Sequence, residues 1–256
     1  MRSTTGNGAA AVSLEPFEIV NPDGAARVLL VCEHASAHIP RELNDLGLAP
    51  QDRRSHAAWD PGARPVAIGL AERFDARLVA GTVSRLVYDL NRPPEAPDAI
   101  PQRSERIEVP GNRVLDADMR AARIAAIHDP FRAALAAAIR PDTVLVTIHS
   151  FTPVYFGQAR PVEVGILHDT DARLADAMLD AASGADLRVE RNQPYGPEHG
   201  VTHTLREHAL PANLLNVMIE IRNDLIADAA GQQVIADTLA AWLEAALASL
   251  SVERTA

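Results

Sequence analysis

The stretch Thr143-Val-Leu-Val-Thr-Ile-His-Ser150 indicates both the fold class and the place of the functional site. A run of Val, Leu, Ile and Thr of this length is typical of a strand that is buried on both faces. The strand ends at His149, and Phe151-Thr-Pro153 then breaks it. Because ligands of open α/β sheets bind beyond the carboxyl ends of the strands, we expect His149 to face the site.

A second apolar run, Arg27-Val-Leu-Leu-Val-Cys-Glu-His34, also delivers a histidine at its end. Two strand-end histidines predict a metal ion at one edge of the sheet. A hydrolytic zinc needs three protein ligands and an open position for water. The third ligand should be a nearby acid, either Asp60 or Glu33. We favour Asp60, because Glu33 would point away from His34 if the strand continues through both residues.

The rest of the chain alternates predicted strands with predicted helices. Further strands are expected at 77–79, 83–90, 162–167, 187–189 and 214–221, and helices at 40–46, 63–74, 116–139, 171–182 and 231–250. This alternation predicts a three-layer αβα sandwich, phosphorylase/hydrolase-like, with a mostly parallel (mixed) central sheet. Asp116 should cap the third helix, and Pro130 should kink it. We expect residues 15–256 to form one domain after a loose tail at 1–14.

The composition argues against several kinds of partner. A formal net charge of -10 argues against a general nucleic-acid binder, which would carry a basic face. No continuous apolar run approaches about 18 residues, so we expect no membrane helix. The single cysteine, Cys32, allows no internal disulfide and fits a reducing cytoplasm. Residues 1–14 lack the basic start and apolar core of a signal peptide.

Glu220 lies inside the apolar run Val217-Met-Ile-Glu-Ile221. A charge in such a run is costly unless it is paired or functional. Glu220 either pairs with Arg222, which shares its face of the strand, or acts as a general base toward a zinc-bound water.

Two arginines mark the ends of the expected strand in Ser84-Arg-Leu-Val-Tyr-Asp-Leu-Asn-Arg92. Arginine binds a carboxylate through two parallel hydrogen bonds. Arg85, Asn91 and Arg92 close to a metal would therefore suit an acidic substrate. The alternative is that these arginines form surface salt bridges with acidic neighbours. The following segment, 93–115, is rich in proline and charge, and loops of this length often serve as lids or binding loops.

Seven blocks of sequence together resemble the N-formylglutamate amidohydrolase family. They occur in order between about residue 27 and residue 247, so the likeness covers nearly the whole chain. The blocks are Cys-Glu-His-Ala-Ser (32–36), His-Ala-Ala-Trp-Asp-Pro-Gly-Ala (56–63), Ser-Arg-Leu-Val-Tyr-Asp-Leu-Asn-Arg-Pro (84–93), Ile-Pro (100–101), Pro-Gly-Asn (110–112), Ile-His-Ser-Phe-Thr-Pro (148–153) and Ile-Glu-Ile-Arg-Asn-Asp-Leu-Ile (219–226).

The resemblance implies a role for each candidate residue, since this family looks related to zinc carboxypeptidases and aspartoacylases. By similarity, the two histidines bind Zn2+ or another divalent metal, and Glu220 is the base. The remaining residues would polarise the scissile carbonyl or bind the substrate carboxylate, namely Arg85, Asn91, Arg92 and, as an added candidate, Arg222. One departure concerns Ala37, because the relatives carry an acidic ligand at that position. We expect Asp60 to replace it.

The expected function is a zinc-dependent amidohydrolase that removes an N-formyl or other small N-acyl group from an acidic amino acid. For N-formyl-L-glutamate the products would be formate and glutamate, as in histidine breakdown. Two alternatives stay open. One is a related hydrolase with another acyl group or amino acid. The other is a binding protein for acidic ligands that has lost efficient catalysis, as the missing acid at Ala37 would allow.

Overall fold

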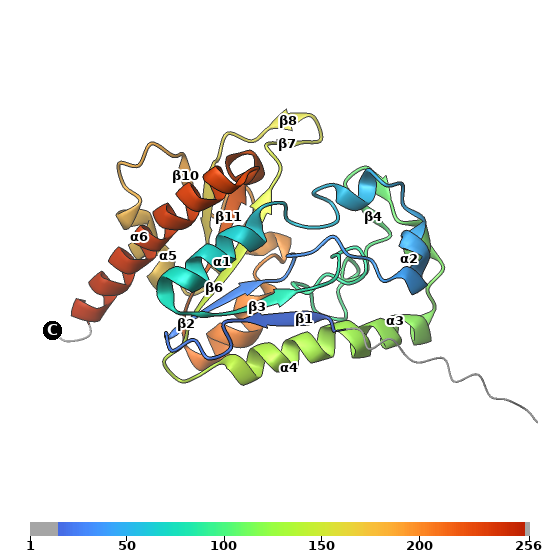
Figure 1. Ribbon diagram of the computed structural model, residues 1–256, viewed down its shortest axis with the longest axis horizontal. Helices are drawn as coiled ribbons and strands as arrows, with labels where there is room; N and C mark the ends of the chain where they lie inside the picture. Colours follow the sequence, from blue (N-terminus) through green and yellow to red (C-terminus); the bar gives the residue numbers. More distant parts are fainter. Residues whose placement is uncertain (1–14, 254–256) are drawn as a thin grey trace, which may run out of the picture.

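A seven-stranded sheet runs through the centre of the computed structural model, which describes residues 15–253 (Figure 1). The strands are arranged in the order β1-β3-β2-β6-β11-β9-β10. Their bounds are Phe17–Val20 (β1), Val28–Cys32 (β2), Arg77–Gly81 (β3), Val144–Phe151 (β6), Val164–Leu167 (β9), Val189–Arg191 (β10) and Leu215–Arg222 (β11). The predicted tail at 1–14 lies outside the described residues.

Strand direction makes the sheet mixed, as the sequence predicts. The four central strands β3, β2, β6 and β11 run parallel to one another. The edge strand β1 runs antiparallel to β3, and β9 runs antiparallel to β11 while pairing in parallel with β10. The carboxyl ends of the central strands therefore meet at one edge of the sheet.

Helices cover both faces of this sheet (Figure 1). One face carries α1 (Ala63–Phe74), α5 (Arg173–Ala181) and α6 (Ala229–Glu253), and the other carries α4 (Asp129–Ala138). Strand β2 divides its side chains between the two layers. Val28, Leu30 and Cys32 join the cluster with α1 and α6, whereas Leu29 and Val31 join the cluster with α4. This alternation confirms the predicted three-layer sandwich.

The long helix expected at 116–139 is interrupted by a π-helical turn. Asp116 caps α3 (Ala117–Arg123), since its Oδ1 accepts a hydrogen bond of 2.8 Å from the Met119 N–H. A π turn at Ile124–His128 then leads into α4, with the Asp129 N–H bonded to the Ile124 carbonyl. Pro130 lies at the start of α4. Because proline has no N–H to donate, the regular bonding pattern cannot continue through it.

The expected strand at 83–90 is wrong. These residues form a series of turns between β3 and the next segment. The Ser84 hydroxyl donates to the Ala58 carbonyl at 2.7 Å and accepts from the Leu86 N–H at 3.2 Å. Such local bonds compete with a strand ladder. The apolar side chains of the segment, including Leu86 and Tyr88, pack instead into the cluster with α4.

Short elements complete the described chain. Two small hairpins pair β4 (Arg103–Ser104) with β5 (Ile107–Glu108) and β7 (Val154–Tyr155) with β8 (Gln158–Ala159). The helix expected at 40–46 is a 3-10 helix, Arg41–Gly47, that contains left-handed residues. The other short helices are Asp52–Arg54, Pro110–Arg113 (α2), Pro197–His199, Leu205–Ala209, which is π-helical, Leu210–Ala212 and Asn223–Ile226.

Helix α6 is long and apolar enough to cross a membrane by length and composition alone, which the sequence did not lead us to expect. Core helices pass the same test. In this fold, one side of α6 packs against α1 and α5, with Leu239, Trp242 and Leu243 buried in the shared cluster. These contacts account for the apolar character of the buried side.

Candidate active site

The carboxyl edge of the central strands brings the predicted chemical groups together. His34 follows the end of β2, and His149 lies near the end of β6. Glu220 lies on β11 directly opposite His149 in the parallel register. All three side chains are buried, with His34, His149 and Glu220 exposing 2%, 1% and 4% of their surface. The structure thus brings these three predicted residues together at one edge of the sheet.

Asp60 connects the two histidines. Its Oδ2 lies 2.9 Å from Nδ1 of His149 and 3.3 Å from Nδ1 of His34. The backbone fixes this position, because the Asp60 N–H bonds to the His34 carbonyl at 3.0 Å. The next turn requires Gly62, which has φ of +81° and approaches the Ile226 carbonyl so closely that a Cβ would lie 2.4 Å from that oxygen. Asp60, His34 and His149 thus present three ligand atoms within 4.8 Å of one another.

Two further carboxylates lie beside the outer nitrogens of the imidazoles, one as a hydrogen-bond partner of His34 and one as an ionic contact of His149. Nε2 of His34 lies 2.7 Å from Oδ1 of Asp89, and Nε2 of His149 lies 3.1 Å from Oε2 of Glu33. Metal-binding histidines usually donate their other ring N–H to such a carboxylate. Glu33, which we considered as a metal ligand, therefore contacts the side of the His149 ring that faces away from Asp60. Asp89 was not among the residues that we predicted at this site.

The donor set fits a divalent metal ion. A neutral imidazole whose proton is on Nε2 presents a lone pair at Nδ1 to the carboxylate of Asp60. The lone pair and the carboxylate repel each other unless a cation or a second proton lies between them. Three carboxylates surround the imidazoles, those of Glu33, Asp60 and Asp89, and the guanidinium of Arg85 contacts the last two. With neutral imidazoles and a protonated Glu220, the cluster carries two excess negative charges. A divalent ion would balance them.

The pKa values in the metal-free protein reflect this crowding of charge. Burial would lower the pKa of His149, but the charges of Glu33 and Asp60 raise it well above its usual value. Burial would likewise raise the pKa of Glu33, yet the neighbouring His149 lowers it. The same competition lowers the pKa of Asp60, where the charge of His34 outweighs burial. All of these groups are therefore held in their charged forms by one another.

Glu220 differs from the other acids because no basic group bonds to it. Its Oε2 is buried and has no hydrogen-bond partner among residues 15–253. Burial and the charge of Asp60 raise the pKa of Glu220 to about 7. The alternative that Glu220 pairs with Arg222 does not hold in this structure. A carboxylate that ionises near neutral pH beside a group of possible metal ligands is suited to accept a proton from water.

The arginines and the amide of the 84–92 segment have separate positions. Arg85 reaches Oδ2 of Asp89 at 2.6 Å and lies 3.6 Å from Oδ1 of Asp60. Asn91 is buried, and its amide donates to the Val201 carbonyl at 2.5 Å. Arg92 donates from Nε to Asp98 at 2.7 Å and from Nη1 to the Gly200 carbonyl at 3.0 Å. Arg92 therefore forms a salt bridge with an acidic neighbour, which was the alternative that we predicted for the arginines of this segment.

Arg222 is not brought together with the other candidates. Its guanidinium bonds to Asp224 at 2.8 Å and to Glu163 at 3.2 Å. It does not line the cavity that holds His34 and His149. A role for Arg222 in substrate binding therefore gains no support from its position.

A cavity of about 290 Å³ opens onto this cluster. Its walls include Arg85, Asn91 and Arg92, together with residues that the sequence did not single out as binding groups. Among these, Glu105 comes from the β4–β5 hairpin inside the 93–115 segment, and Tyr155 comes from the β7–β8 hairpin. The part of 93–115 around Glu105 thus lies at the cavity, as expected of a binding loop. Tyr195 also lines it and accepts a hydrogen bond of 2.8 Å from Arg160.

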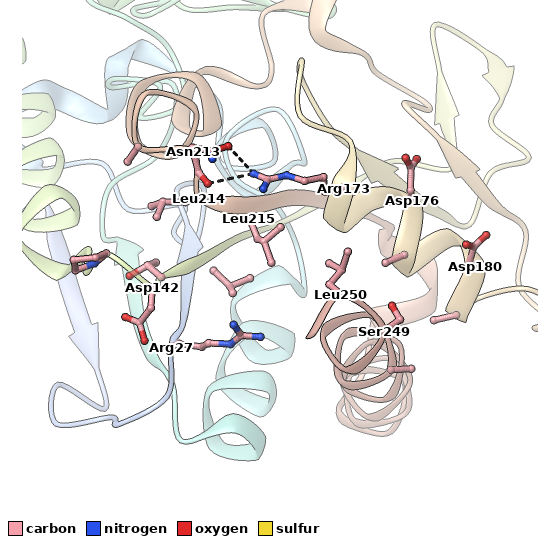
Figure 2. Close-up of a pocket in the computed structure, with 17 residues that line it drawn as sticks. Arg27, Asp142, Arg173, Asp176, Asp180, Asn213, Leu214, Leu215, Ser249 and Leu250 are labelled. Atoms are coloured by element: carbon pink, nitrogen blue, oxygen red, sulfur yellow. Dashed lines mark hydrogen bonds between the residues drawn. The ribbon is translucent and has the colours of Figure 1, made fainter. Parts of the chain in front are cut away.

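A larger cavity of about 900 Å³ lies at the opposite edge of the sheet, where β6 and β11 begin (Figure 2). Figure 2 shows Arg173 reaching across to Asn213, whose Oδ1 it bonds at 2.9 Å. Aspartates and arginines line this cavity without any histidine. It contains no set of groups comparable to the histidines, Asp60 and Glu220. The smaller cavity is therefore the candidate active site.

Comparisons with known proteins agree with this geometry. The family model of N-formylglutamate amidohydrolases matches residues 26–227. A gene product of Agrobacterium tumefaciens, known from its crystal structure, is 54% identical, with a TM-score of 0.92 over 93% of this chain and 97% of that one. The N-formylglutamate amidohydrolase of Ralstonia eutropha JMP134 is 18% identical and shares the fold, with a TM-score of 0.66 over 95% of this chain and 100% of that one.

The comparison with curated proteins gives no match. The family model nevertheless spans most of the chain, including the segments that carry His34, His149 and Glu220. The chain therefore belongs to the N-formylglutamate amidohydrolase family.

Proposed function

We propose that the protein is a zinc-dependent amidohydrolase that removes the formyl group from N-formyl-L-glutamate or a closely similar acidic N-acyl amino acid. The observation that carries the proposal is the convergence of His34 Nδ1, His149 Nδ1 and Asp60 Oδ2, with the unpartnered carboxylate of Glu220 beside them. The reaction would give formate and glutamate, as in histidine breakdown. The buried, unpaired Cys32 is consistent with a cytoplasmic protein.

His34, His149 and Asp60 would hold the metal. A bound zinc lowers the pKa of a water molecule and polarises a carbonyl oxygen. Glu33 and Asp89 would keep the two imidazoles oriented and their Nδ1 atoms unprotonated. Of the groups around the site, Glu220 is the acid without a fixed partner, so it can accept the proton that the attacking water loses.

The same residue can complete the reaction. As the water oxygen bonds to the formyl carbon, the carbon–nitrogen bond breaks, and Glu220 returns the proton to the departing amine. Arg85 supports this step from the cavity wall, where its guanidinium can stabilise negative charge on the carbonyl oxygen. The close contacts of Arg85 with Asp89 and Asp60 would hold it in place.

Substrate recognition would depend on Arg92 and Asn91, which line the cavity. Hydrogen bonds between their side chains and the backbone of residues 200–204 fix them in place. A guanidinium at the wall of a small cavity suits a compact ligand with a carboxylate. Hydrolysis of N-formylglutamate, measured against the N-acetyl and N-formylaspartate analogues, would separate the proposed substrate from the alternatives of another acyl group or another amino acid.

The test combines metal analysis with turnover. We expect purified protein to bind zinc at the His34–His149–Asp60 site and to release formate from N-formyl-L-glutamate. His149→Ala should lose both properties, while His38→Ala, which alters an exposed histidine, should lose neither. Zinc-loaded protein without turnover would favour a binding protein for acidic ligands. Turnover that survives His149→Ala would exclude the metal mechanism.

A further inference from the structure

We propose that a second site for zinc, or for another transition-metal ion that prefers imidazole, is formed by His128, His203 and Glu207. One ligand atom from each of these residues lies within 4.8 Å of the other two. The residues come from separate parts of the chain. His128 ends the π turn that precedes α4, and Glu207 lies in the π turn Leu205–Ala209. Two histidines and one glutamate are a ligand set used by zinc proteins.

The contacts within the group already resemble those of a metal site. His203 and Glu207 are four residues apart, and Nε2 of His203 lies 3.1 Å from Oε2 of Glu207. Nδ1 of His128 lies 2.9 Å from Oδ1 of Asp129, so Nε2 of His128 remains for a ligand. Ligand atoms around a tetrahedral zinc are roughly 3.3 Å apart. Side-chain movements of about 1 Å would therefore complete the site.

In two of the three proposed ligands, the side-chain atom that would not bind the metal is contacted by a neighbouring residue. Asp129 orients the imidazole of His128, and Arg132 contacts Oε1 of Glu207. Such contacts outside the ligand shell are typical of metal sites. Oε2 of Glu207, which lies 3.1 Å from Nε2 of His203, remains for the metal ion.

The group has its own access to solvent. It lies in a cavity of about 580 Å³ that is also lined by residues 93–95 and Arg206. None of the residues lining this cavity lines the candidate active site. A metal ion could therefore enter without passing the active site, and water could occupy a fourth position.

Occupancy would stabilise a segment that supports the active site. Thr204 lies between the ligands His203 and Glu207. Its hydroxyl donates to Oε1 of Glu33 at 2.5 Å, and its N–H donates to Oδ1 of Asn91 at 3.1 Å. A metal ion that also binds His128 would connect this segment to the π turn that precedes α4. The proposed site is therefore structural, and its ligands are separate from those proposed for catalysis.

Zinc stoichiometry of the full-length protein tests the proposal. After treatment with a chelator and dialysis against Zn²⁺, we expect two equivalents per chain by elemental analysis. The variant His128→Gln/His203→Gln should retain one, and so should His34→Ala/His149→Ala. His38→Ala is the matched histidine control and should bind both. Circular dichroism of each variant would establish that it is folded.

A second measurement uses the His34→Ala/His149→Ala background, in which the active-site histidines are absent. Added Zn²⁺ should raise its Tm, and the further change His203→Gln should abolish that rise. The proposal is overturned if Zn²⁺ leaves the Tm of the background unchanged, or if His128→Gln/His203→Gln binds as much zinc as the unaltered protein. Failure of the active-site proposal would look different. Unaltered protein would then bind a single equivalent that is lost in His128→Gln/His203→Gln.

Discussion

Glu220 and His149 are direct neighbours across the parallel strands β11 and β6, and both side chains are buried at the same edge of the sheet. Strand pairing therefore sets the distance between the proposed base and the proposed metal ligand. Because the backbone of a central sheet is rigid, this relationship does not depend on loop conformation.

Replacing Glu220 by glutamine should remove the proton acceptor while leaving the shape of the site intact. We expect kcat to fall by about 10²- to 10⁴-fold, the usual contribution of general acid–base catalysis. Zinc content and KM should change little, since Glu220 holds neither the metal nor the substrate in the proposed scheme. Steady-state kinetics and elemental analysis check this, with Glu190→Gln as a control on a strand away from the site. Near-normal kcat in Glu220→Gln would assign the base to another residue.

The pH dependence of activity should reflect the same carboxyl group. Burial and the charge of Asp60 raise the pKa of Glu220 to about 7, so the protonated form persists to a higher pH than for an ordinary glutamate. A base must be ionised to act, and kcat/KM should therefore increase as pH rises through the ionisation of Glu220. In the zinc-loaded enzyme this rise should occur at a lower pH than the pKa of the metal-free protein, because the cation favours the carboxylate. The profile is measured with N-formyl-L-glutamate, and a kcat/KM that falls as pH rises from 5 to 7 would contradict this assignment.

Glu33→Gln should weaken metal binding without removing a ligand. The substitution keeps the size of the side chain but removes the charge that faces Nε2 of His149. Loss of such an orienting carboxylate typically lowers metal affinity by about 10- to 100-fold. Competition with a chelator measures the zinc Kd. An unchanged Kd would show that Glu33 does not orient His149 toward the metal.

Arg92 and Arg222 should respond differently to the same substitution. Arg92→Met removes a guanidinium from the cavity wall and should raise KM for N-formyl-L-glutamate by at least about tenfold, as expected for a lost charged hydrogen bond. Arg222→Met alters an arginine that contacts Glu163 and Asp224 outside the cavity, and it should leave KM unchanged. Thermal unfolding of both variants controls for loss of structure. A raised KM in Arg222→Met alone would restore the role that the sequence suggested for it.

Hydrophobic periodicity was sufficient to predict the layers of the fold and the strand-end groups. The buried strands carrying His149 and Glu220 are long and mostly apolar, so their ends and the polar side chains near them could be located. The segment 83–90 was misjudged because its apolar residues are equally compatible with a strand. Hydrogen bonds of Ser84 to the distant Ala58 and to the nearby Leu86 determine its turns.

Residues that reach the site from distant loops could not be identified from spacing. Asp89 contacts His34 across 55 positions of the chain, and Thr204 contacts Glu33 across 171. Such approaches depend on how the layers pack. Asp89 did carry one usable signal, since it is a charge within an apolar run, like Glu220. Tyr195 lies in irregular sequence and carried none.

The cavity is assembled from two kinds of structure. The proposed metal ligands and base are attached to the sheet edge or to the turn beside it, whereas Glu105 and Tyr155 enter from two small hairpins at the periphery. Insertions or substitutions in those hairpins can alter the shape of the entrance without displacing His149 or Glu220. The substrate preference of the proposed hydrolase could therefore be changed through these two hairpins while the proposed metal ligands and base stay in place.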